Sequence, residues 1–91
     1  MTIKYTKQFL NKLEDIFAES DYVLRYEKGS FKSGYCVLKD TKIAIVNKYY
    51  TTEGKVNVLI DILKSIEIDR TNLSQKNTDL LVQLSQTSLK L

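Results

Sequence analysis

Two short apolar runs joined by a polar turn constrain the fold more than any other part of the chain. The runs are Cys36–Leu38 and Ile43–Val46, each of strand length and together rich in β-branched residues. Between them lies Lys39–Lys42, whose Asp and Thr side chains can bond their own backbone in a turn. We therefore expect a β-hairpin in which each run lies near the centre of a sheet.

The hairpin is predicted to be apolar on both of its faces. Successive side chains of a strand point to opposite faces, so Tyr35 and Val37 share one face. Cys36 and Leu38 then share the other face. Both apolar faces need to be covered, and only helices or a partner chain can cover them.

Two stretches carry apolar residues at the three- and four-residue spacing of an amphipathic helix. The first is Thr2–Ser20, with Thr2 or Thr6 as the expected N-cap, and the second follows Thr51 or Thr52. The apolar positions of the first are Phe9, Leu10, Leu13, Ile16 and Phe17. Those of the second are Val56, Val58, Leu59, Ile60, Ile62, Leu63 and Ile66. The second set covers more than half of the helix circumference, so this helix should be the most buried one.

A chain of 91 residues is expected to form one domain. Tyr22–Tyr26 alternates like an edge strand and precedes the hairpin. We predict an α+β fold of order α-β-β-β-α-α, in which helices pack on a three-stranded, mainly antiparallel sheet. Residues 1–69 form this α+β domain. Residues 70–91 form a C-terminal helical segment of the same domain or an oligomerisation tail.

The C-terminal segment is polar, and leucines are its main apolar residues. Leucines and one asparagine recur with a 3.5-residue period, and we take this seam as the candidate protein interface. Its residues are Leu73, Asn77, Leu80, Leu84 and Leu91. The seam packs on the domain or on a second copy, where an asparagine can fix the register, unless it belongs to a frayed tail.

Basic residues are concentrated in the middle of the chain. Residues 25–55 contain seven basic and three acidic side chains, a net charge of +4 against +3 for the whole chain. Lysines interleaved with tyrosines can bind phosphate groups and stack bases, so nucleic-acid binding is the alternative function. The candidate surface is Arg25, Lys28, Lys32, Lys39, Lys42, Lys48, Tyr49 and Tyr50. Lysines at strand ends and turns also keep proteins soluble, which is the simpler interpretation.

The composition argues against catalysis. The chain has no histidine, which removes the commonest general base and the commonest zinc ligand. Its one cysteine, Cys36, lies in an apolar run and is predicted to be a buried core residue rather than a reactive thiolate. We predict no catalytic residue, no metal and no cofactor. A lone cysteine and the lack of an apolar run of about 20 residues favour a cytoplasmic protein without a membrane partner.

The order of the elements and two runs resemble the front of the zincin-like domain of ImmA/IrrE-type metallopeptidases. The runs are Gly34–Leu38 and Lys42–Asn47, and the resemblance covers about Lys4 to Ile66. The family's next helix carries His-Glu-x-x-His, whereas Val56–Leu63 has neither the histidines nor the glutamate. The resemblance therefore implies a degenerate scaffold that has lost its metal and suits binding or regulation. The chain is also similar in character to small bacterial proteins.

A non-enzymatic, cytoplasmic protein-interaction module is the function that these features favour. Two apolar sheet faces and a leucine seam indicate self-association, so the expected partner is a second copy in a homodimer or another protein. Nucleic acid is the alternative partner. Its binding should weaken steeply as salt rises, whereas apolar self-association should not.

Overall fold

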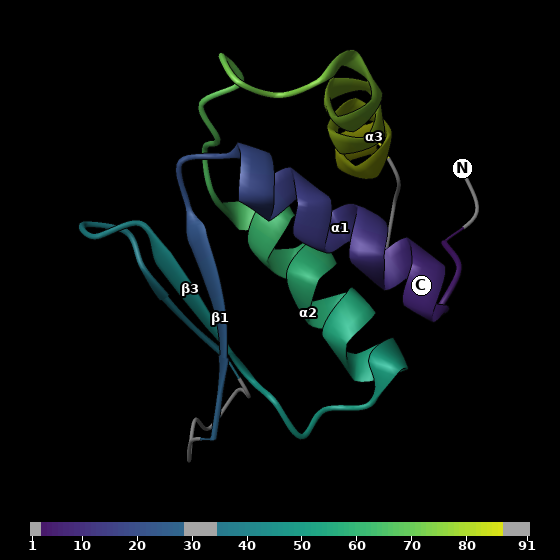
Figure 1. Cartoon of the computed structure of the whole chain (residues 1–91), viewed down its shortest axis with the longest axis vertical. Coiled ribbons are helices and arrows are strands. Elements are labelled where there is room, and N and C mark those ends of the chain that lie inside the picture. The colour runs from purple at the N-terminus through teal and green to yellow at the C-terminus, as the bar shows by residue number, and fades with distance from the viewer. Residues whose placement is uncertain (1–2, 29–34, 87–91) are drawn as a thin grey trace.

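The computed structural model describes residues 3–28 and 35–86. These residues form three helices and one three-stranded sheet (Figure 1). In chain order the elements are α1 (Lys7–Glu19), β1 (Val23–Glu27), β2 (Tyr35–Leu38), β3 (Ile43–Asn47), α2 (Thr52–Ser65) and α3 (Gln75–Gln86). The predicted α+β class and the order α-β-β-β-α-α are confirmed.

The third strand, β3, lies at the centre of the sheet between β1 and β2. It pairs antiparallel with β2, as expected for the hairpin, and parallel with β1, which is an edge strand as predicted. The prediction that both hairpin runs lie near the centre was wrong for the first run, because β2 is the other edge. The central position suits β3, whose residues are apolar up to its last one, because a strand with neighbours on both sides is shielded from water.

The turn between β2 and β3 closes without a glycine. Its last residue, Lys42, has a φ of 57°, a left-handed conformation that residues other than glycine seldom adopt. Two contacts hold it there, one with the first residue of β1 and one with Asp21 just before that strand. The N–H of Val23 donates to the Lys42 carbonyl at 2.9 Å, and Lys42 Nζ lies 2.5 Å from Asp21 Oδ2. The hydrogen bond to Asp21 keeps the pKa of the Lys42 ammonium above its ordinary value.

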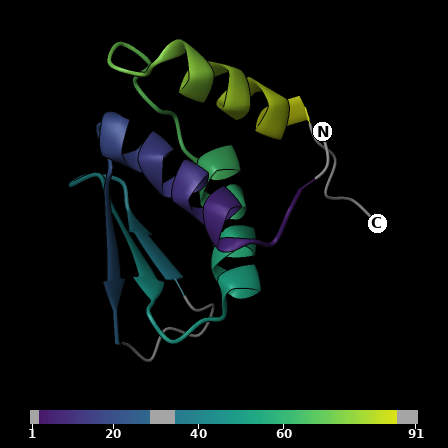
Figure 2. The ribbon, with the colours of Figure 1, turned by 45° about the vertical axis from the view of Figure 1, so that its right-hand side comes forward.

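Two helices, α1 and α2, lie side by side on one face of the sheet (Figures 1 and 2). The β3 side chains on this face, Ala44 and Val46, are fully buried beneath them. Every apolar position predicted for the first helix is buried. So are those predicted for the second, except for the half-buried Ile66 at its end. The two helices and the inner face of the sheet therefore form the main core.

Threonine caps set where these two helices begin. The hydroxyl of Thr6 accepts from the N–H of Phe9 at 3.1 Å, so α1 begins at Lys7. The hydroxyl of Thr51 accepts from the N–H of Gly54, also at 3.1 Å. Of the two candidates that the sequence left open for each cap, the structure thus selects Thr6 and Thr51.

The third helix, α3, packs across α1 and α2 as a further layer (Figure 2). Its Leu81 and Leu84 are only 6% and 1% exposed. Among residues 3–28 and 35–86, none of the helices combines the length and the apolar character needed to cross a bilayer. The sequence also predicts a loop over Lys28–Ser33, which lies, except for Lys28, outside the described residues.

Truncation of Phe17 should test where the core lies. Because Phe17 is 2% exposed, Phe17→Ala should lower the free energy of unfolding by about 3 to 5 kcal/mol. The matched control is Tyr49→Ala, since Tyr49 is 68% exposed and its loss should cost less than about 0.5 kcal/mol. Urea denaturation followed by circular dichroism measures both, and equal losses would contradict the assigned core.

Candidate functional site

The second face of the sheet carries apolar side chains that no described helix covers (Figure 2). We name it the outer sheet face and define it by Val23, Arg25, Glu27, Cys36, Leu38, Ile43, Ile45 and Asn47. Its most exposed apolar residues are Val23 and Leu38, which are 55% and 43% exposed. Ile43 lies between them, opposite Val23 on one side and Leu38 on the other. These three residues therefore form an apolar strip across all three strands.

The charges on the outer sheet face neutralise each other. Arg25 Nη2 lies 2.6 Å from Glu27 Oε2 on the same strand. Both side chains are well exposed to water, which screens the pair, so it adds little to stability. Ile45 lies between Arg25 and Cys36 and continues the apolar surface. A neutral, largely apolar face suits contact with another apolar protein surface better than contact with a polyanion.

The described part of the leucine seam packs against the rest of the same chain. Its residues that are buried or half-buried against the rest of the protein are Leu73, Asn77, Leu80 and Leu84. Leu81, which the 3.5-residue period passes over, is buried as well. Leu91 lies outside the described residues. The described part of the C-terminal segment therefore packs on the α+β domain.

The side chain of Asn77 attaches α3 to α1 through two carboxylates. Its amide nitrogen donates to Asp15 Oδ2 at 2.9 Å and to Glu19 Oε1 at 2.8 Å. The N–H of Ser74, just before α3, also donates to Glu19 Oε1 at 2.8 Å. Hydrogen bonds to charged acceptors are stronger than those between neutral groups, so this fully buried side chain fixes where α3 lies. No described residue donates to the buried Asn77 Oδ1.

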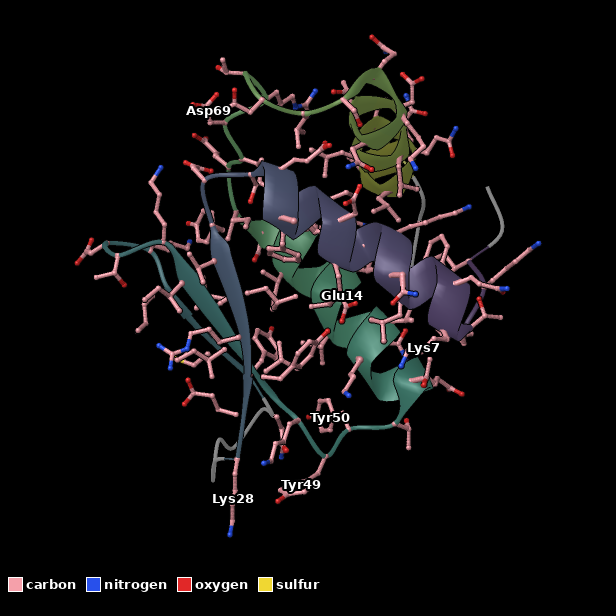
Figure 3. The ribbon with its side chains drawn as sticks, in the orientation of Figure 1. Lys7, Glu14, Lys28, Tyr49, Tyr50 and Asp69 are labelled. Atoms are coloured by element: carbon pink, nitrogen blue, oxygen red, sulfur yellow. The ribbon has the colours of Figure 1, made fainter. Side chains whose placement is uncertain are left out.

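The structure divides the predicted nucleic-acid surface between the two ends of the sheet. In the turn at one end lie Lys39 and Lys42. Beyond β1 and β3 at the other end lie Lys28, Lys48, Tyr49 and Tyr50 (Figure 3). Arg25 lies on the outer sheet face, and Lys32 lies outside the described residues. Two of these cations, Arg25 and Lys42, form ion pairs, so the described residues do not make one continuous basic surface.

The described residues contain no cluster of histidine, cysteine, aspartate or glutamate that could hold a metal ion. Cys36 does not belong to the buried core, contrary to the prediction. It is half-buried on the outer sheet face, because alternation along β2 turns the neighbouring Tyr35 and Val37 toward the core instead.

A groove of about 540 Å³ runs along the edge of the sheet between α1 and β1, and its lining includes Glu14, Ala18, Leu24 and Tyr26. Glu14 projects from α1 toward this space, where it accepts a hydrogen bond from the Tyr26 hydroxyl (Figure 3). Lys55 Nζ lies 4.9 Å from the centroid of the Tyr26 ring. Burial and the Glu14 carboxylate raise the pKa of the Tyr26 phenol far above its ordinary value, so its hydroxyl remains a donor.

Sequence reasoning missed both the groove and the Asn77 contact. Glu14 and Tyr26 are 12 positions apart, and Asn77 lies 62 positions from Asp15. Periodicity reports which face of a helix or strand is apolar, but it carries no signal for polar pairs between distant elements. The only available signal was an asparagine at an apolar position of the seam, and it pointed to Asn77 without indicating its partners in α1.

Comparison of the chain with models of known protein families, with curated proteins and with solved structures found no match. The resemblance to ImmA/IrrE-type metallopeptidases stays a prediction. Function therefore has to be inferred from the surfaces of the chain itself.

Replacement of Asn77 should loosen the attachment of α3. Asn77→Ala removes two hydrogen bonds to carboxylates in a fully buried position, and should lower the free energy of unfolding by about 2 kcal/mol. Asn57→Ala is the matched control, because Asn57 is an exposed residue of α2. Urea denaturation measures both variants. A loss no larger for Asn77→Ala than for Asn57→Ala would show that the contact does not hold α3.

Acid should weaken the same attachment. Hydrogen bonds from the Ser74 N–H and the Asn77 side chain lower the pKa of Glu19 below its usual 4.5. Because the folded pKa lies below the unfolded one, the ionised carboxylate stabilises the fold above pH 4.5 and loses this effect as pH falls through the folded pKa. Glu19→Gln should therefore flatten the fall in stability between about pH 5 and pH 2. Glu67→Gln, at an exposed linker position, is the control and should flatten it less.

Proposed function

We propose that this chain is a non-enzymatic protein-interaction module that associates with a second copy of itself through the outer sheet face. The observation that supports the proposal is the apolar strip of Val23, Ile43 and Leu38, which no described helix covers. Exposed apolar surface of this kind commonly marks a protein interface. A reducing cytoplasm is the expected location, since the lone thiol of Cys36 has no internal partner.

A second copy suits this face in both shape and charge. Two sheets can pack face to face about 10 Å apart, with their apolar side chains interdigitating. The outer sheet face is neutral, because Arg25 and Glu27 pair with each other, so two copies meet without repulsion. A two-fold axis would bring the same strip of each copy against the other, as in most homodimers.

Nucleic-acid binding is the second candidate function. Its support is the group of Lys28, Lys48 and Tyr49 at one end of the sheet (Figure 3). Lys48 Nζ lies 5.3 Å from the centroid of the Tyr49 ring, and Tyr49 is 68% exposed. Cations beside an exposed ring can bind phosphate while the ring stacks on a base. This group contains only two cations of the predicted surface, so it ranks below the apolar face.

Lysine substitutions on the outer sheet face should abolish association through that face. In Val23→Lys and Leu38→Lys the new charge enters an apolar contact, so the face-to-face contact should be lost while the monomer stays folded. Both positions are well exposed in the monomer, at 55% and 43%. The matched control is Tyr5→Lys, because Tyr5 is an exposed apolar residue of similar exposure, 45%, outside the sheet. Sedimentation velocity over a range of protein concentrations gives the mass of each variant.

Three other outcomes would each count against the proposal in a different way. A wild-type chain that stays monomeric at every concentration would remove the self-association proposal. A wild-type monomer that also binds single-stranded nucleic acid, with an affinity that falls steeply as salt rises, would favour the second candidate. Equal association of wild type, both face variants and the control would mean that another surface mediates the contact.

A further inference from the structure

The edge of β1 that faces away from β3 is open. The backbone groups of Val23 and Glu27 bond to Lys42 and Lys48, the residues just before and just after β3. Backbone groups alternate in direction along a strand, so those of Leu24 and Tyr26 point to the opposite edge. Within the described chain no other strand pairs with that edge, which lies at the margin of the sheet in Figure 2. Two residues of β1 therefore present backbone donors and acceptors that no described strand pairs with.

Several devices that block an edge strand are missing from β1. Natural edges are protected by proline, by bulges, by charges that point inward or by other charged side chains. The two charged side chains of β1, Arg25 and Glu27, lie on the outer sheet face and pair with each other. The chain has no proline, and the five residues of β1 pair with β3 in an unbroken register. The groove beside α1 adjoins this edge, and Ala18 in its lining is a small, exposed side chain that leaves room there. An added strand would find both backbone partners and space for its inward side chains.

The charges of β1 favour a second β1 as the added strand. Arg25 and Glu27 flank Tyr26, one on each side, and both lie on the outer sheet face. In an antiparallel pair with its two-fold axis at Tyr26, Arg25 of each copy lies opposite Glu27 of the other. Two opposite-charge pairs then form across the junction. The same axis places Leu24 opposite Lys28 of the second copy, and these residues bring further unpaired backbone groups together.

We propose that the open edge of β1 pairs antiparallel with β1 of a second copy and joins two sheets of three strands into one of six. This contact goes beyond the proposed function, because it extends the sheet in its own plane and does not use the apolar strip. Either contact can form without the other. The second open edge, on β2, is less suited to it, since Tyr35–Leu38 carries no charged side chain that would fix a register.

Two single charge reversals and their mixture test the contact. Arg25→Glu places a carboxylate opposite Glu27 of the other copy, and Glu27→Arg places a guanidinium opposite Arg25 of the other copy. Because Arg25 and Glu27 also lie on the outer sheet face, all variants of this test carry Leu38→Lys as well, which removes the contact through that face. Each edge variant alone should then self-associate about tenfold more weakly at this edge, because two attractive pairs become repulsive. In an equimolar mixture, each acidic edge meets a basic one, so association should return. The Arg25–Glu27 pair within one chain is absent from both variants, so it does not explain why association returns on mixing.

The mixture needs a control with the same net charges. Lys12→Glu and Glu53→Arg change exposed residues away from β1 and carry the same overall charge as the two edge variants. If mixing Lys12→Glu with Glu53→Arg raised the mass as much as mixing the edge variants, general attraction between unlike proteins would explain the result. The proposal would then be wrong.

Amide hydrogen exchange on the wild-type chain locates the contact independently. At concentrations where the chain associates, the N–H groups of Leu24 and Tyr26 should exchange at least about tenfold more slowly than in the dilute monomer. The outer-face variants Val23→Lys and Leu38→Lys should leave this slowing intact. Association without protection at these two amides would overturn the edge contact and leave the proposed function standing. Loss of this protection in the outer-face variants would also overturn the edge contact. The protection would then depend on association through the outer sheet face and not on pairing of β1. A chain that never associates would refute both.

Discussion

The buried amide of Asn77 helps to keep α3 away from the outer sheet face. By donating to Asp15 and Glu19, it joins the buried Leu81 and Leu84 in holding α3 on the helical side of the molecule, across α1 and α2. The described chain then has no helix left for the outer sheet face, and the apolar strip there remains exposed. The two hydrogen bonds between α3 and α1 thus have a consequence on the opposite side of the sheet.

Much of the fold could be predicted from the sequence because its signals are local. The apolar spacing of α1, the alternation of β1 and the apolar run of β3 depend only on the geometry of a helix or a strand. The strand order depends on contacts between segments that are distant in the sequence, so no local signal predicts it. In the seam, a 3.5-residue period selects Leu80, whereas the straight helix α3 buries positions 77, 81 and 84. A helix packed across two others follows its own 3.6-residue period, not that of a supercoil.

The candidate surfaces were harder to predict than the elements that carry them. The sequence indicated that both faces of the hairpin are apolar, but the choice of the covered face depends on where distant helices pack. The basic residues look clustered when counted along the chain. A strand rises about 3.3 Å per residue, so strands of five residues carry Lys42 and Lys48 to opposite ends of the sheet. The groove beside β1 depends on contacts between α1 and the sheet, which have no counterpart in any single stretch of sequence.

Lys42 combines a backbone requirement with a charge requirement at one position. Its left-handed φ favours glycine or asparagine, while its ammonium group has to reach Asp21. Glycine would relax the turn and sever the contact, and arginine would keep the positive charge without easing the backbone. No ordinary amino acid satisfies both demands fully. The tip of the hairpin is therefore a compromise, and the site should tolerate few replacements even though half of the Lys42 side chain is exposed to water.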